Sequence, residues 1–113
     1  MKKLQALAVA LVFSAAPLAA NASSDPFAKC QETQSHDVCF AAMSTYEERM
    51  RNASDMSEFC MLGTKYVALQ GYDSVLSSNP LEHKNAYDSS KMLAGRCGEP
   101  YRGYLLEIHK RLK

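Results

Sequence analysis

Cys30 and Cys39 stand close together with His36 and Asp37 between them, and these residue types could do three kinds of chemistry. They could bind a metal, place a reactive thiol beside a base, or join in a disulfide. Structural zinc sites usually pair cysteines separated by about two to four residues, and redox-active pairs use Cys-x-x-Cys. Neither spacing occurs in this sequence, so we expect no metal site here.

Other potential metal ligands are scattered along the chain. His83 and His109 have no paired ligand nearby. Methionine sulfur could bind copper, but methionine at helical spacing more often fills a hydrophobic core. The methionines in question are Met43, Met50, Met56, Met61 and Met92. We therefore expect no cofactor.

A cysteine nucleophile is the second possibility, because Cys39 follows His36 by three residues on an expected helix. Such a nucleophile needs a free thiolate. The four cysteines are an even number in a short chain, which favours disulfides in an oxidising compartment. The sequence also lacks a glycine-rich phosphate loop and a Gly-x-Ser-x-Gly motif. We predict that the protein is not an enzyme.

The first residues resemble an export signal of bacterial type. Lys2 and Lys3 precede an apolar run from Leu4 to Ala16, and small residues follow up to Ala22. This pattern predicts a signal peptide over residues 1–22 that is cleaved after Ala22. A membrane anchor is the alternative, but the apolar run is shorter than the roughly 20 residues that a spanning helix needs. We expect a periplasmic or secreted protein.

Residues 23–113 are expected to form a single helical domain with little net charge. Without Lys2 and Lys3 the chain has 11 basic and 12 acidic residues, so we expect no nucleic-acid partner. The charge is uneven, because residues 23–60 carry 3 basic and 7 acidic groups, and residues 96–113 carry 5 basic and 2 acidic groups. These two segments are expected to complement each other in the fold.

The apolar residues recur at helical rather than strand spacing, which predicts an all-α bundle of four or five short helices and no sheet. Helix starts are indicated by capping residues and prolines. The expected starts are Ser24-Asp25-Pro26, Ser35, Asp55 with Glu58, Asn79-Pro80 with Glu82, and Glu99-Pro100. Gly71 is a candidate end or weak point of the third helix, and Gly95 and Gly98 indicate the end of the fourth.

The cysteine positions favour one of three possible disulfide pairings. Cys60 lies 18 residues before Ser78 and Cys97 lies 19 residues after it, so a helical hairpin with its turn at Ser78 brings them together. Cys30 and Cys39 lie at similar distances on either side of Ser35. We predict the pairs Cys30–Cys39 and Cys60–Cys97. Closing the longer loop should contribute roughly 4 kcal/mol.

The C-terminal stretch is the candidate interaction surface. Six tyrosines lie in the chain, and tyrosine is favoured at protein interfaces. The expected last helix has an apolar face of Tyr101, Leu105, Ile108 and Leu112, which could dock on the protein's own acidic part, on a partner or on anionic lipid without spanning a membrane. The predicted partner-binding residues are Tyr101, Arg102, Tyr104, His109, Lys110 and Arg111.

The cysteine layout Cys30-x8-Cys39-x20-Cys60-x36-Cys97 resembles that of the resistance-associated periplasmic immunity proteins of type VI secretion, and the matching pieces are the expected signal peptide, Phe59-Cys60, the Asn79-Pro80 turn and the closing Cys97. The resemblance implies an all-helical protein that binds and blocks a toxin delivered by a neighbouring cell. Our leading hypothesis is therefore a non-catalytic protein-binding module, such as an immunity or inhibitor protein. A periplasmic stress chaperone or envelope assembly factor is the alternative, and an enzyme or metal carrier is a third class.

Overall fold

The computed structural model describes residues 25–113, and the signal peptide predicted for residues 1–22 lies outside them. The described chain forms five helices and contains no strand, which confirms the predicted all-α bundle. The helices are α2 (Pro26–Thr33), α3 (His36–Arg51), α4 (Met56–Leu76), α5 (Pro80–Arg96) and α6 (Tyr101–Leu112). Within residues 25–113, no helix is both long enough and apolar enough to cross a membrane.

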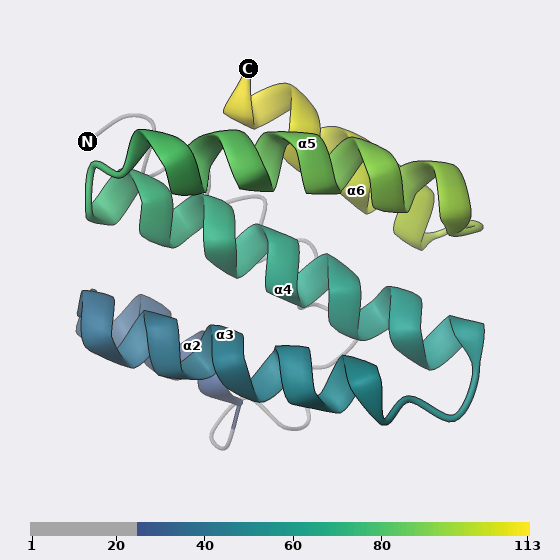
Figure 1. Cartoon of the computed structure of the whole chain (residues 1–113), viewed down its shortest axis with the longest axis horizontal. Helices are drawn as coiled ribbons and strands as arrows, with labels where there is room; N and C mark the ends of the chain where they lie inside the picture. Colours follow the sequence, from purple (N-terminus) through teal and green to yellow (C-terminus); the bar gives the residue numbers. More distant parts are fainter. Residues whose placement is uncertain (1–24) are drawn as a thin grey trace.

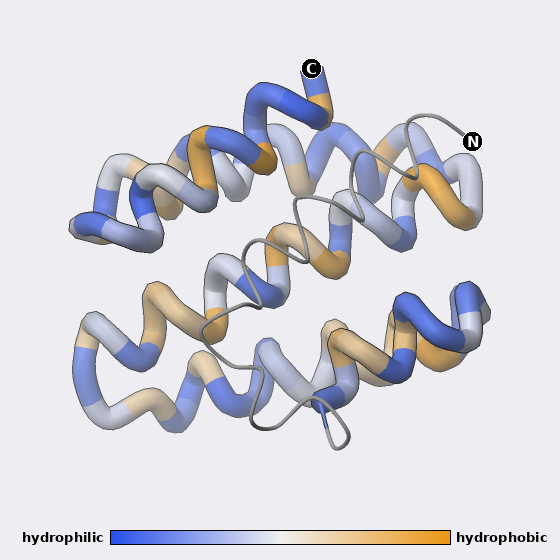
Figure 2. The backbone as a smooth tube through the Cα atoms, turned by 180° about the vertical axis from the view of Figure 1, so that it is seen from behind, coloured by the Kyte–Doolittle hydropathy of each residue, from blue (hydrophilic) through white to orange (hydrophobic). Residues whose placement is uncertain are grey.

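Helix α4 is the centre of the bundle. Figure 1 shows it between a layer made of α2 and α3 and a layer made of α5 and α6. It packs against α3, α5 and α6, and buried residues of all five helices join in one hydrophobic cluster. Hydrophobic and hydrophilic residues alternate along the helices (Figure 2), as amphipathic packing requires. Because α4 has neighbours on several sides, it is buried around most of its circumference, and Val67, Ala68 and Leu69 are fully enclosed.

Side-chain caps start four of the five helices, three of them at the predicted residue, while α2 is capped by Asp25 and not by the expected hydroxyl of Ser24. Asp25 accepts from the Phe27 N–H, Ser35 from Val38, Asp55 from Glu58, and Asn79 from Leu81 and Glu82. The Glu58 carboxylate in turn accepts from the N–H and hydroxyl of Ser54, at 2.8 and 2.9 Å. Helix α6 begins after Pro100 without a side-chain cap. The helix boundaries thus follow from local hydrogen bonding.

Gly71 does not end or weaken a helix, contrary to one expectation from the sequence. Helix α4 continues through it to Leu76. A Cβ at Gly71 would lie 3.0 Å from Cδ2 of Leu112, which is buried at the end of α6. The glycine is therefore needed for the close approach of α6 to α4, and the helical hydrogen bonds of α4 tolerate it.

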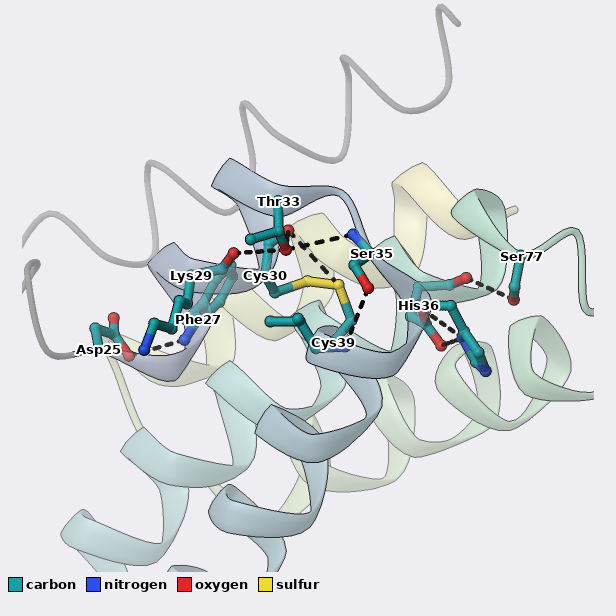
Figure 3. The surroundings of a disulfide bond; sticks show 11 residues. Asp25, Phe27, Lys29, Cys30, Thr33, Ser35, His36, Cys39 and Ser77 are labelled. Atoms are coloured by element: carbon teal, nitrogen blue, oxygen red, sulfur yellow. Dashed lines mark hydrogen bonds and ion pairs between the residues drawn. A yellow bond between two sulfur atoms is a disulfide. The ribbon is translucent and has the colours of Figure 1, made fainter.

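Both predicted disulfides are present. Cys30 joins Cys39, with an S–S distance of 1.99 Å, and Cys60 joins Cys97, with an S–S distance of 2.11 Å. Figure 3 shows the first of them between α2 and the first turns of α3, close to the cap at Ser35. Cys39 is therefore bonded to Cys30 and is not a free thiol beside His36. Two disulfides fit a non-reducing environment.

Candidate functional site

Helix α6, which carries the predicted partner-binding residues, docks on its own domain. Leu105, Ile108 and Leu112 are buried, and the helix packs against α4 and α5. It does not dock on α2 or α3, which carry most of the acidic segment and lie in the opposite layer (Figure 1). None of the ion pairs found within residues 25–113 joins the acidic segment 23–60 to the basic segment 96–113. The expected charge complementarity between these segments is therefore wrong.

Two of the predicted binding residues fasten α6 to α5. Arg102 Nε donates to the carbonyl oxygens of Ala94 and Cys97, at 3.2 and 3.1 Å, and so satisfies the end of α5. His109 Nδ1 lies 2.8 Å from the Tyr87 carbonyl oxygen, to which it can donate, and the two rings stack with their centroids 4.0 Å apart. These contacts give Arg102 and His109 an internal role in fixing the position of α6.

The other predicted residues remain at or near the surface of α6. Tyr101 and Tyr104 are half-buried and meet edge to face, with ring centroids 6.3 Å apart. Lys110 and Arg111 are exposed, and Arg111 pairs with Glu107 at 2.9 Å. Sequence reasoning missed Leu106, which is 47% exposed and lies beside the buried stripe of α6. We call Tyr101, Tyr104, Leu106, Lys110 and Arg111 the α6 outer face.

A titratable cluster that the sequence did not predict lies where α3 and α5 begin and α4 ends. Asp73 is fully buried, and both its carboxylate oxygens lie 2.9 Å from Nδ1 of His36. Figure 3 shows His36 at the start of α3, with Ser77, the residue that follows α4, nearby. The hydrogen bond to Asp73 raises the pKa of His36. Burial, and then the neighbouring Asp73 carboxylate, raise the pKa of Glu82 to about 7.

Glu82 does not cap α5 in the way that its position suggested. The N–H of Asn79, which a capping-box acid would bind, donates instead to the Ser74 carbonyl oxygen at 2.9 Å. The carboxyl group of Glu82 turns inward, where its Oε1 is buried and has no hydrogen-bond partner among the described residues. No group of three metal-ligating side chains that could hold an ion occurs within residues 25–113.

A second buried network joins the start of α2 to α3 and α4. Lys65 Nζ lies 2.6 Å from Oδ2 of Asp25, and both side chains are more than nine-tenths buried. The Tyr46 hydroxyl donates to Oδ1 of Asp25. Burial, and then this hydrogen bond, raise the pKa of Tyr46. Since Asp25 also caps α2, one carboxylate holds three helices together.

Ser74 and His83 have the residue types of a nucleophile and its base, but both side chains form hydrogen bonds to backbone carbonyl groups of the surrounding helices. The Ser74 hydroxyl is buried within α4 and donates to the Gly71 carbonyl oxygen at 2.7 Å. His83 Nε2 lies 2.6 Å from the Leu112 carbonyl oxygen, to which it can donate, and its Nδ1 lies 3.3 Å from the Ser74 oxygen. The pair links α4, α5 and the end of α6.

No protein-family model, curated protein or solved structure matches this chain. Its function is therefore argued from its own geometry. The polar side chains described above stabilise contacts between helices, and the α6 outer face is where predicted binding residues remain at the surface.

Proposed function

We propose that the protein is a non-catalytic module that binds another protein through the α6 outer face. The observation that carries this proposal is that two kinds of contact hold α6 on the domain, namely apolar burial and hydrogen bonds. Its apolar stripe is buried against α4 and α5, and Arg102 and His109 bond to α5. The outer side chains are thus held by a rigid helix, which lowers the entropy cost of binding.

The composition of the α6 outer face suits a protein partner. It combines two tyrosines, a leucine and two cations, and aromatic residues and arginine are enriched where binding energy is concentrated. Residues 80–113 carry 7 basic and 4 acidic groups, which favours a partner with an acidic surface. Anionic lipid is a weaker fit, because the apolar stripe that would enter a membrane is already used in the core.

The place of action that fits this proposal lies outside the cytoplasm. Two disulfides need a non-reducing compartment, and the predicted signal peptide would deliver the chain to the periplasm. The resemblance to periplasmic immunity proteins makes a secreted toxin or effector the partner class we propose. Binding and blocking such a partner requires a stable surface and no catalytic residue.

The test is capture of a partner from periplasmic extract with matched variants. Leu106→Ser with Lys110→Ser removes one apolar and one basic side chain from the α6 outer face. Lys91→Ser with Met92→Ser removes the same types from exposed positions on α5. We expect one stoichiometric partner with the native chain and the α5 variant, and its loss with the α6 variant. Failure of the native chain to retain any stoichiometric partner would refute the proposal.

A chaperone with many clients is the second candidate function, favoured by a different observation. Large apolar side chains are exposed on four different helices: Phe40, Met56, Leu81, Met92 and Leu106. They do not form one contiguous patch of the kind that marks a specific interface, so a chaperone would use them only for weak contacts with the apolar segments of unfolded chains. Suppression of aggregation of several unrelated proteins, without a stoichiometric complex, would favour this function over the first.

A further inference from the structure

A groove lies between the last turns of α3 and the first turns of α4, in a part of the molecule that the proposed function does not use. Its volume is ≈ 520 Å³, within the range of protein sites for small ligands. The α3 side consists of residues at helical spacing, and the α4 side supplies Glu58 and the apolar floor. The lining residues are Thr45, Glu48, Arg49, Asn52, Glu58, Met61 and Leu62.

The two walls of the groove carry carboxylates from different helices. Glu48 belongs to α3, and Glu58 belongs to α4. Both hydrogen bonds from Ser54 go to Oε1 of Glu58, and they lower the pKa of this carboxyl group. The second oxygen, Oε2, makes no hydrogen bond among the described residues, so it is available to a ligand. The pair can therefore accept hydrogen bonds from opposite sides of a ligand placed between them.

The electrostatic surroundings favour a cation in this groove. The carboxyl end of α3 places the negative end of a helix dipole near Glu48, and the start of α4 places a positive end near Glu58, so the two dipoles offset each other and the carboxylates set the sign of the groove. The one cation in the lining is Arg49, whose guanidinium lies over the Tyr46 ring, 5.7 Å from its centroid. Residues 23–60 as a whole carry 7 acidic and 3 basic groups. An acidic ligand would meet repulsion on approach.

The floor of the groove is apolar, which favours a ligand that has an apolar chain next to its charged group. Leu62 is buried beneath it, and Met61 is half-buried. Methionine is flexible and polarisable, and it is common at surfaces that adapt to varied partners. A long side chain with methylene groups and a planar cation at its tip matches carboxylate walls and an apolar floor together.

We propose that the α3–α4 groove binds an arginine side chain of a protein partner. This goes beyond binding at the α6 outer face, because the groove lies between other helices and has the opposite charge preference. The methylene stem packs on Met61 and Leu62, and the guanidinium donates to Glu48 and Glu58. A partner that used both surfaces would need an acidic surface for α6 and a basic segment for the groove.

The test uses a defined probe and the full chain labelled with ¹⁵N. N-acetyl-arginine amide is titrated while amide signals are followed, with the uncharged citrulline analogue and N-acetyl-glutamate amide as comparisons. We expect saturable shifts confined to residues 45–62 and an affinity for arginine about tenfold above that for citrulline. Stronger binding of the glutamate probe, equal binding of citrulline, or no saturable shift in the groove would overturn the proposal.

Two double variants of equal net charge distinguish binding in the groove from a general attraction to the acidic residues of α2 and α3. Glu48→Gln with Glu58→Gln keeps the size of both side chains and should weaken arginine binding about tenfold. Glu32→Gln with Glu47→Gln removes two charges from exposed residues of α2 and α3 outside the groove, and should weaken it less than about twofold. Equal losses in both variants would show diffuse attraction without a site. Because the probe needs no natural partner, this result is independent of the α6 capture experiment.

Discussion

Lys65 places a charged group inside the bundle, where Asp25 and Tyr46 enclose it. Its ammonium group lies 2.6 Å from the Asp25 carboxylate and within 5.7 Å of the Phe27 and Tyr46 ring centroids. A buried pair of this kind contributes little compared with an apolar replacement of both partners. Removal of one partner is different, because it leaves the other as an uncompensated buried charge.

Lys65→Met should therefore lower the free energy of unfolding by about 3 kcal/mol, since Asp25 loses its cation while remaining buried. Chemical denaturation in urea measures the change. Lys84→Met is the matched control, because Lys84 pairs with Asp88 on the surface, where the side chains are 71% and 57% exposed. The control should leave the free energy of unfolding almost unchanged, because an exposed ion pair contributes little to stability. Similar losses for the two variants would contradict the role of burial.

Glu82 makes stability depend on pH in a predictable direction. Its pKa in the folded protein, about 7, lies above its ordinary value of 4.5, so the folded chain holds this proton more tightly than the unfolded chain. The favourable contribution is complete below the ordinary pKa and is lost as the pH rises through about 7. The raised pKa of His36 acts in the same direction.

The free energy of unfolding should consequently fall between about pH 5 and about pH 8, and Glu82→Gln should flatten this fall. Glutamine resembles the protonated acid in shape and has no proton to lose. Urea denaturation at a series of pH values measures the slope for the native chain and for Glu82→Gln. Glu47→Gln, at an exposed position on α3, should leave the slope unchanged. A native slope of the opposite sign would show that Glu82 is not held in its protonated form.

At the residue scale, local patterns were predictable and distant partners were not. The caps at Ser35, Asp55 and Asn79 involve neighbours two or three residues away, so residue type and spacing were enough to find them, and the start of α2 was predicted with its cap one residue too early. The partners of His36 and Lys65 lie 37 and 40 positions away in the chain. The sequence around Glu82 suggests a helix cap, because nothing near it in the chain indicates that its carboxyl group lies close to Asp73.

At the scale of the helices, α4 shows why an apolar stripe in the sequence is an incomplete guide to which residues of a helix are buried. Phe59, Leu62, Tyr66, Leu69 and Leu76 lie near one apolar stripe of this helix, and the structure buries Leu62 and Leu69 but leaves Phe59, Tyr66 and Leu76 only partly buried. Polar residues such as Thr64 and Gln70 are buried instead. A helix enclosed by several neighbours has no single solvent face, so its burial depends on packing that local periodicity does not contain.

Two glycines of the helices should respond oppositely to alanine. Gly95 is exposed in α5, and a Cβ added to it would meet nothing within 4 Å beyond its chain neighbours and the backbone of its own helix. Gly95→Ala should therefore raise the free energy of unfolding by about 0.5–1 kcal/mol through the lower entropy of the unfolded chain. Gly71→Ala should lower it, because the new methyl group would crowd the buried Leu112. Thermal and urea denaturation measure both. Equal stabilisation by the two changes would mean that α6 can move away from α4 without cost.

At the scale of the whole molecule, three layers separate the charges of the chain. The acidic segment lies in α2, α3 and the start of α4, and the basic segment lies in α6 on the other side of α4 (Figure 1). Sequence composition revealed both segments, but it could not show that α4 lies between most of their charged residues and that the segments meet where the Cys60–Cys97 disulfide joins the end of one to the start of the other. The predicted disulfides were correct because equal distances from a helical turn follow from antiparallel geometry alone.

The two disulfides should contribute unequally to stability. Replacing Cys60 and Cys97 by alanine should lower the free energy of unfolding by about 4 kcal/mol, against about 3 kcal/mol for Cys30 and Cys39, because the longer loop restricts the unfolded chain more. Urea denaturation of the two double variants measures the difference. A larger loss for the shorter loop would show that native contacts around Cys30 and Cys39 outweigh loop entropy.

The two covalent loops follow one another along the chain, from residue 30 to 39 and from residue 60 to 97, and neither encloses nor crosses the other. Each bond can therefore form without the other being in place. If the N-terminal side of the chain meets an oxidant first, the Cys30–Cys39 bond can form as soon as residue 39 is exposed. Cys97 becomes available to Cys60 only later. Oxidation in that order yields the native pairing directly and requires no isomerase to correct it.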